Sequence, residues 1–347
     1  MKIKVSEQIV AHNWDKLVMG LGGTIFQSTL WATYWAQRNS LAVPQFIELW
    51  SDTGEVLGVA LAFHERSRLR LLNSLTKYLR FDALPAVQNN DAKLLDLFMH
   101  LIELQARRVG NVQLVVNSYG SHSALDVLQQ RDFNYWKRLE FELDLRRSED
   151  DLWEGLEYKR QKNIKKAMRL GVTIADLPSD CGIAELNRLE AESVQRAVGR
   201  GGRDFADNGK DDSLRALIDS SYGRIVGAKL DGEIVSVGLF TYFNGLVYHH
   251  LSGHSSKALN AQAATLLVWE MIKGYRGLGA TRFNFGGCSW DAIEENSPEH
   301  GVYVYKKAFG ATAVECASGV KVLRKRANSV AKAMRSIVTF TTAKSSQ

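Results

Sequence analysis

The spacing of hydrophobic positions predicts a mixed helix-and-strand unit in the first 145 residues. Two apolar runs, at 46–50 and 56–63, flank a short polar stretch that contains Asp52-Thr53-Gly54, which is typical of a hairpin. Apolar residues with the spacing of a helix follow, and this pattern ends at Gly110. The predicted elements after the hairpin are a helix over 94–104, a short buried strand at 112–116, a small helix at 125–130 and a strand through 141–143.

The same order of spacings recurs near the C-terminus. Asp231-Gly232 and Asn244-Gly245 mark the turns of a three-stranded meander. The elements predicted after it are a helix over 267–275, a strand at 283–285, a short helix at 305–309 and a strand at 314–323. The repeated pattern predicts an α/β fold with mixed sheets, built from two copies of one unit.

Between the copies, the sequence predicts one long helix from Glu149 to Leu170. Ser148 is a typical N-cap residue with Asp151 three positions later, and Gly171 follows the helix. One face of the predicted helix is apolar, and another carries Lys159, Lys162, Lys166 and Arg169. Arg160 falls among the apolar residues, so we expect it to form an ion pair or to contact a ligand.

These elements divide the chain into four predicted segments. A chain of 347 residues is about two domains long. We predict an N-terminal domain over 1–147, a connecting basic helix over 148–171, a C-terminal domain over 172–324 and a basic amphipathic tail over 325–347.

Composition excludes several classes of protein. Apolar residues make up 45% of the chain and charged residues 24%, as in globular proteins. The three cysteines are scattered and form no disulfide framework. Charges interrupt the N-terminal segment, so no secretory signal is predicted, and glycines divide the uncharged run at 17–37. We therefore expect a cytoplasmic protein.

The net charge of +6 is concentrated in two places. From Ala317 to the end there are seven Lys and Arg residues and no acid, and six cations lie within 159–169. Such clusters indicate anionic partners at particular sites rather than a generally basic surface.

Four motifs, in order over about 300 residues, resemble those of one family. The segment 156–167 followed by Gly171-Val172 is similar to the signature L-x-x-K-x-R-x-x-I-R-K-A-x-x-x-G-V of the Fem family of nonribosomal peptidyl transferases. Phe26 to Trp31 is similar to the family's F-x-S-x-x-W segment. Residues 283–287 resemble its D-F-G-G strand end, with Asn284 in place of the acid, and residues 305–310 resemble F-K-x-x-F-G.

The resemblance implies two tandem domains of the GNAT (acetyltransferase) type and a superfamily shared with BioF-like acyltransferases. It also implies attack of an amine on an activated acyl group, an aminoacyl-tRNA ester or a thioester, with no metal or other cofactor. Lys306 matches the lysine of F-K-x-x-F, and we interpret it as a catalytic cation beside the acyl group. A surface lysine is the alternative. Arg160 is the second catalytic candidate.

Candidate substrate-binding residues belong to the same motifs or to the basic segments. Gly286 and Gly287 end a strand where such domains admit the acyl carrier, although a plain turn explains two glycines equally well. The basic loop at 197–204 could close over an anionic substrate or be a solvated loop. The full set is Ser28, Trp31, Lys159, Lys166, Arg200, Arg203, Gly286, Gly287 and Tyr305.

Metal and base chemistry find weaker support. His249, His250 and His254 have no carboxylate partner nearby in the sequence, which argues against metal ligation. His250 and His254 stay open as general bases. The acid-rich loop at 291–299 could orient an amine or be a solvated loop.

The sequence thus predicts an aminoacyl- or acyltransferase whose acceptor is an amine of an anionic cell-envelope precursor, a peptidoglycan or saccharide intermediate, with the acceptor end of a tRNA as a further partner. One alternative is an acyl-CoA-dependent N-acyltransferase of polysaccharide biosynthesis, although the stretches at 80–85 and 257–262 lack the glycines that cradle a pyrophosphate. The other alternative is a binding protein that has the fold without the chemistry.

The tail carries a helical apolar stripe with cations beside it. The stripe consists of Ala327, Val330, Ala331, Met334, Ile337 and Val338. Such a helix could bind peripherally to the inner membrane surface or pack against the second domain.

Overall fold

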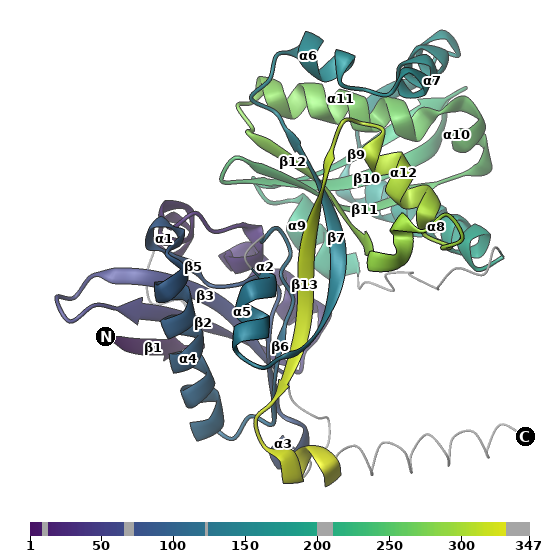
Figure 1. Ribbon diagram of the computed structural model, residues 1–347. Coiled ribbons are helices and arrows are strands. Elements are labelled where there is room, and N and C mark those ends of the chain that lie inside the picture. Colours follow the sequence, from purple (N-terminus) through teal and green to yellow (C-terminus); the bar gives the residue numbers. More distant parts are fainter. Residues whose placement is uncertain (9–12, 66–72, 122–123, 200–210, 331–347) are drawn as a thin grey trace, which may run out of the picture. The chain divides into compact units, whose positions relative to one another are not determined.

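The computed structural model describes residues 1–8, 13–65, 73–121, 124–199 and 211–330 (Figure 1). The chain divides into two compact units. The first combines Met1–Trp136 with the segment that begins at Cys316, and the second comprises Lys137–Glu315. Each is described by itself below.

The sheet of the first unit has the strand order β1-β2-β3-β4-β6-β13, and β5 pairs with β3. All neighbours are antiparallel except β4 and β6, which are parallel. The elements are β1 (Lys2–Ser6), α1 (Trp14–Gly20), η1 (Ile25–Gln27), α2 (Thr29–Arg38), β2 (Ala42–Trp50), β3 (Val56–Glu65), α3 (Asn73–Thr76), β4 (Tyr78–Phe81), β5 (Ala86–Val87), η3 (Gln88–Asn90), α4 (Ala92–Arg108), β6 (Gln113–Val116), α5 (Ala124–Gln130), the start of β7 (Asn134–Asp144) and most of β13 (Thr312–Val322).

The predicted amphipathic helix over 94–104 is α4, and it forms the core of this unit against one face of the sheet. Asp91 caps it by accepting from the N–H groups of Lys93 and Leu94. Its stripe, which includes Phe98 and Ile102, packs on strand residues of the sheet. The periodicity of the segment therefore predicts both the helix and its buried face.

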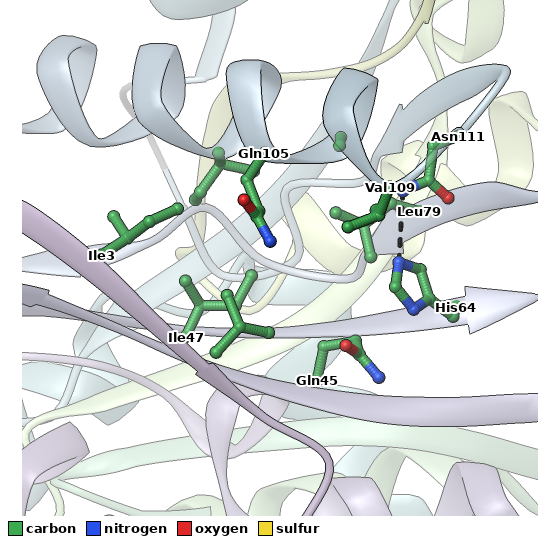
Figure 2. A pocket seen from close by; sticks show the side chains of 11 residues that line it. Ile3, Gln45, Ile47, His64, Leu79, Gln105, Val109 and Asn111 are labelled. Atoms are coloured by element: carbon green, nitrogen blue, oxygen red, sulfur yellow. Dashed lines mark hydrogen bonds between the residues drawn. The ribbon is translucent and has the colours of Figure 1, made fainter.

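A small cavity of about 50 Å³ lies between α4 and the sheet of the first unit (Figure 2). Mostly aliphatic side chains line it. At one side, Asn111 Nδ2 lies 3.2 Å from His64 Nε2, within hydrogen-bond distance. None of the predicted site residues lines this cavity.

The sheet of the second unit has the order β7-β12-β11-β10-β9-β8, with β11 and β12 parallel and the other neighbours antiparallel. The predicted meander corresponds to β9, β10 and β11. Besides β7, the elements are α6 (Glu149–Glu154), α7 (Tyr158–Arg169), β8 (Thr173–Asp176), α8 (Ser179–Val198), α9 (Asp211–Ile218), β9 (Gly223–Leu230), β10 (Glu233–Phe243), β11 (Leu246–His254), α10 (Ser256–Ala261), α11 (Ala263–Gly277), β12 (Arg282–Ser289), η4 (Trp290–Ile293), α12 (His300–Lys307) and the start of β13.

Helices cover both faces of this second sheet (Figure 1). Along β9, Val226 and Ala228 join the core that contains α11. Ile225 and Gly227, which alternate with them, lie on the opposite face, where a Cβ at Gly182 of α8 would meet Ile225 at 2.6 Å. Alternating strand residues thus serve two helical layers, which explains the continuous apolar runs of these strands.

The paths of β7 and β13 differ from the predicted domain boundaries at 147 and 324. Most of β7, predicted to close the first domain, pairs with β12 of the second unit. Most of β13, predicted to close the second domain, pairs with β6 of the first unit, and Lys321 contacts Glu103 of α4 at 2.9 Å. Strand periodicity carries no information about which distant strand will be the partner, so the sequence could not reveal this exchange.

The predicted single helix over 149–170 is wrong, because the chain forms two helices, α6 and α7. The capping box of Ser148 and Asp151 is present, but the first helix ends at Glu154. Leu156 is buried in the core, and the N–H of Glu157 donates to Ala308 O at 3.0 Å instead of continuing the helix. Both helices contribute to the core of the second unit, so the segment is not a separate connector.

Little of the predicted tail lies within the described residues. A helix begins at Lys325, where the first stripe residue, Ala327, is 9% exposed and Val330 is 46% exposed. Residues 331–347, with the rest of the stripe, lie outside the described residues. Among the described helices, none has the length and apolar character needed to cross a bilayer.

Candidate active site

The parallel pairing of β11 and β12 stops part-way along both strands. It covers three residue pairs and ends at Tyr248 and Asn284. Beyond this point, Gly286 has a φ of +72°, a conformation that favours glycine. A Cβ at Gly286 would lie 3.1 Å from His249 O and 3.8 Å from Lys306 Nζ. We call this place, where the pairing ends beside Lys306, the ladder end.

Lys306, on α12, brings a cation to the ladder end. Its Nζ donates a hydrogen bond to Gly287 O at 2.8 Å and lies 5.7 Å from the centre of the Phe141 ring. Burial lowers the pKa of Lys306 to about 8. Of the groups that face it, Cys288, Glu140 and Glu299 raise this pKa and Arg138 lowers it further. Lys306 is therefore a cation at neutral pH that can lose its proton at modestly alkaline pH.

Arg160, on α7, is buried, and no carboxylate of the described residues forms an ion pair with it. It donates to Thr265 Oγ1 and to Tyr305 O, both at 3.1 Å. Its guanidinium lies 4.4 Å and 4.8 Å from the ring centres of Tyr305 and Phe309. Of the two predicted alternatives, an ion pair or a ligand contact, the described residues show no ion pair, and two aromatic rings and two neutral acceptors surround the charge. Since Tyr305 precedes Lys306, Arg160 holds the helix that carries the lysine.

Glu140, on β7, is a buried carboxylate that the sequence analysis missed. It is 0% exposed and accepts hydrogen bonds from the Arg138 guanidinium at 2.6 Å, the Tyr248 hydroxyl at 3.1 Å and the Asn284 amide at 2.8 Å. The only sequence signal was an acid between the apolar residues Leu139 and Phe141. Alternation along a strand would assign such an acid to a solvated face.

The three histidines of β11 are neutral hydrogen-bonding or stacking groups. Burial lowers the pKa of His249 and of His250 to about 3, and that of His254 to about 4. His250 Nε2 lies 2.7 Å from Thr241 Oγ1, and His254 Nδ1 lies 2.8 Å from Ser236 Oγ. The His249 ring stacks on Phe240 at 4.4 Å. Across the described part of the chain, no group of three or more His, Cys, Asp or Glu side chains is placed to hold a metal ion.

Burial also determines the state of the thiol nearest the lysine. It raises the pKa of Cys288 to about 11, so the thiol stays protonated at neutral pH. A protonated thiol is a poor nucleophile. The ladder end therefore offers a cation, backbone carbonyls and neutral side chains, which suits direct transfer between two bound substrates better than a covalent enzyme intermediate.

The family comparison agrees with this geometry. Residues 158–307 match the family model described as an acetyltransferase (GNAT) domain. The match lies wholly within the second unit, Lys137–Glu315. The matched residues include α7, the ladder end and α12, so the predicted acyltransferase is confirmed. A search of curated proteins finds no match to this sequence.

Solved structures show that the fold extends beyond the GNAT domain. A crystal structure of FemX has a TM-score of 0.76 at 15% identity, with 95% of this chain and 99% of that chain covered. The C-terminal domain of a putative lysylphosphatidylglycerol synthetase from Agrobacterium fabrum has a TM-score of 0.52 at 14% identity, covering 93% and 96%. A tandem GNAT protein from the clavulanic acid biosynthesis pathway has a TM-score of 0.52 at 12% identity, covering 93% and 99%. The predicted α/β fold with tandem GNAT-like domains, and the Fem-type resemblance of that fold, are therefore confirmed.

Of the other predicted site residues, Gly286, Gly287 and Tyr305 lie at the ladder end or beside it in the GNAT domain. The Tyr305 hydroxyl donates to Ala264 O at 3.3 Å. Lys159 and Lys166 are exposed on α7, and no ion pair joins either of them to another described residue.

Ser28 and Trp31 belong to the first unit, where both are buried and hydrogen-bonded. Ser28 caps α2 by accepting from the N–H of Trp31. The Trp31 indole donates to Asp82 Oδ2 at 2.8 Å. Arg200 and Arg203 lie outside the described residues.

Proposed function

We propose that this protein transfers an activated acyl group, from an aminoacyl-tRNA ester or a thioester, to an amine of an anionic cell-envelope precursor. The observation that carries the proposal is the position of the Lys306 ammonium beside Gly286, where the pairing of β11 and β12 ends. The proposal is also supported by the similarity of the fold to FemX and to the lysylphosphatidylglycerol synthetase domain.

Lys306 would stabilise the oxygen of the tetrahedral intermediate. The acceptor amine attacks the acyl carbon, a C–N bond forms, and the C–O or C–S bond to the carrier breaks. The proton that the amine loses leaves with the carrier oxygen or sulfur. A partly buried ammonium is worth more to a developing oxyanion than a fully solvated one, because fewer waters screen it.

Arg160 would act as a positioning residue rather than at the reacting atoms. Its guanidinium donates to Thr265 Oγ1 and to the backbone carbonyl of Tyr305, the residue before Lys306. It therefore fixes the C-terminal half of α12, and with it the direction of the Lys306 side chain.

The exposed cations of α7 support an anionic substrate. Elsewhere in this unit, exposed cations such as Arg188 and Lys257 have acidic partners within 3.3 Å. Lys159 and Lys166 are available to phosphates or carboxylates of the carrier or the acceptor. The peripheral membrane contact through the tail and the cytoplasmic location stay predictions.

The second candidate is an acyl-CoA-dependent N-acyltransferase. The GNAT domain match favours it, as does the neighbour from the clavulanic acid pathway, whose structure is described as being without AcCoA, a ligand of the acyl-CoA class. The absence of glycine from 257–262, before α11, argues against a pyrophosphate held by backbone N–H groups in the usual way.

The test is product formation with defined donors. The purified protein is incubated with aminoacyl-tRNA or with a mixture of acyl-CoAs, together with nucleotide-linked and lipid-linked envelope precursors that carry a free amine, and mass spectrometry detects the acylated product. We expect product with the ester donor, and a loss of about 10²- to 10³-fold in kcat for Lys306→Ala. Lys307→Ala is the matched control, because Lys307 is the next residue of α12 and is exposed.

Each other outcome has a definite meaning. Product from acyl-CoA alone establishes the second candidate. Unchanged turnover of the Lys306→Ala variant removes Lys306 from the mechanism. Tight binding of a precursor without turnover of any donor indicates a binding protein.

A further inference from the structure

The strongest candidate beyond the lysine is the buried carboxylate of Glu140, for which the proposed transfer has no role so far. Hydrogen-bond donors reach it from β7, β11 and β12, the three strands that meet at the ladder end. A buried carboxylate is costly unless it is paired and hydrogen-bonded. Because three strands contribute donors to this one acid, the fold stabilises the Glu140 carboxylate in its buried position.

Glu140 determines which way the Asn284 amide points. Asn284 Nδ2 donates to Glu140 Oε2 at 2.8 Å and to Glu142 Oε1 at 3.3 Å, while its Oδ1 accepts from the Gly286 N–H at 2.8 Å. The reversed amide would place Oδ1 against two carboxylate oxygens and lose all three hydrogen bonds. The short contact with Glu140 therefore leaves a single orientation of the amide.

The oriented amide ends the strand pairing. Because the Gly286 N–H donates to a side chain of its own strand, it is not available to continue the ladder with β11, and the pairing stops at Tyr248 and Asn284. The next residue, Gly287, offers its carbonyl to Lys306. A continuous series of contacts therefore leads from Glu140 through Asn284 and the glycines to the lysine.

We propose that Glu140 and Asn284 form a positioning pair, in which one buried negative charge orients the amide that holds Gly286 out of the ladder and so places Gly287 and Lys306 for acyl transfer. The role in transfer rests on the proposed function, whereas the positioning itself does not. Neither side chain touches the reacting atoms.

The pair also explains why an amide occupies position 284. In this chain, a carboxylate at 284 would lie about as close to Glu140 and Glu142 as the Asn284 nitrogen does, and like charges at that separation do not both stay ionised. The negative charge of the site therefore resides on β7, and the neutral donor resides on β12.

Exchange of the two groups tests the pair. The variants are Glu140→Gln, Asn284→Asp and the double variant, in which one negative charge and one amide are kept with their positions exchanged. Glu142→Gln, alone and combined with Asn284→Asp, is the matched control, because Glu142 is the more distant acid and also pairs with Arg282 at 3.5 Å. Readouts are kcat and KM with the donor found above, the thermal midpoint, and the pKa of Lys306 from ¹³C NMR of methylated lysines, assigned with Lys306→Arg.

We expect each single variant of the pair to lose at least about tenfold in kcat with little change in KM, and the double variant to recover most of that loss, since contacting residues couple strongly. Glu140→Gln should lower the pKa of Lys306, and the exchanged pair should restore it. The Glu142 combination should not rescue Asn284→Asp.

A double variant as impaired as the worse single variant, or a Lys306 pKa that does not change in Glu140→Gln, overturns the positioning pair. If the NMR and thermal results follow expectation while no donor is turned over, the pair stands and the proposed function fails. If turnover is lost only because the single variants unfold, the thermal midpoint shows it, and rescue in the double variant still decides.

Discussion

The two units treat the end of their parallel strand pair in opposite ways. In the first unit, hydrogen bonds continue past the β4–β6 pairing, from Asn117 N to Phe81 O at 2.8 Å and from Tyr119 N to Asp82 O at 2.9 Å. In the second unit, the β11–β12 pairing ends at Asn284, whose side chain takes the N–H of Gly286. The same order of elements thus has two outcomes. In the first unit, hydrogen bonds join the chain beyond β4 and β6, and we call this the closed pair; in the second unit, the pairing stops at a ladder end that holds a cation.

Side chains reinforce the difference. In the first unit, Asp82 is 1% exposed and accepts from the Trp31 indole and from the Asn117 amide, so the polar groups there satisfy one another. In the second unit, the ladder end has Lys306, whose Nζ contacts a backbone carbonyl rather than an acid. Polar groups that saturate one another stabilise a fold, whereas a cation held by a neutral acceptor can still serve a substrate.

Among the tests of this comparison, the largest effect is expected from filling the ladder end. Gly286→Ala places a methyl group 3.1 Å from His249 O and near Lys306, at a φ of +72°, and should reduce kcat by about 10²-fold by displacing the reacting groups. Gly171→Ala is the control, since its φ is +79° but a Cβ there meets nothing within 4 Å. The control should lose about 1 kcal/mol of stability and keep its kcat. Equal losses of kcat in both variants would contradict the comparison.

Removal of a side chain from the closed pair should affect stability rather than rate. Trp31→Phe removes the buried hydrogen bond to Asp82 and should reduce the free energy of unfolding by about 1–3 kcal/mol, with kcat and KM unchanged. Trp50→Phe, which removes a part-buried indole hydrogen bond to Glu48, should cost less. Denaturant titration and steady-state kinetics measure both. A raised KM in Trp31→Phe at full stability would instead support the predicted substrate role of Trp31.

The pH profile should reveal the lysine of the second unit. With a pKa of about 8, Lys306 loses its charge above that pH, and kcat should then fall about tenfold per pH unit. Because this pKa lies below the ordinary value of 10.5, the folded protein binds fewer protons than the unfolded chain between the two values, so this group favours folding more as the pH rises. Deprotonation of Lys306 therefore does not by itself destabilise the fold. Lys306→Arg should abolish the fall in kcat above pH 8, because arginine keeps its charge there. If kcat still falls in this variant, another group causes the fall.

The smallest effect is expected on the exposed face of α7. Replacing Lys159 and Lys166 by Gln should raise KM for an anionic substrate several-fold at low salt, and the difference should shrink as salt rises, because exposed charges are screened. Lys257→Gln is the control, since Lys257 already pairs with Asp231 and Glu233. If none of the three substitutions changes KM, the exposed face of α7 does not bind the substrate.

The sequence predicted most of the helices and strands, but fewer of the contacts between them. The amphipathic pattern of α4 and the turns around Asn244-Gly245 were sufficient to locate those elements, because both depend on neighbours in the chain. The break between α6 and α7 was missed, since the burial of Leu156 and the bond from Glu157 to Ala308 come from residues far apart in the sequence.

The candidate site shows the same division. Sequence alone singled out Lys306 and the two glycines, because they form short contiguous motifs, and it determined the repeated order of elements and the cationic face of α7. Only the tertiary structure showed that Glu140 contacts Asn284 and that most of β13 belongs to the first unit. It also showed that the parallel strand pairing stops in the second unit, whereas hydrogen bonds continue beyond it in the first. Each of these depends on hydrogen bonds between strands distant in the chain, and periodicity, which reports only which face of an element is buried, contains no record of such partners.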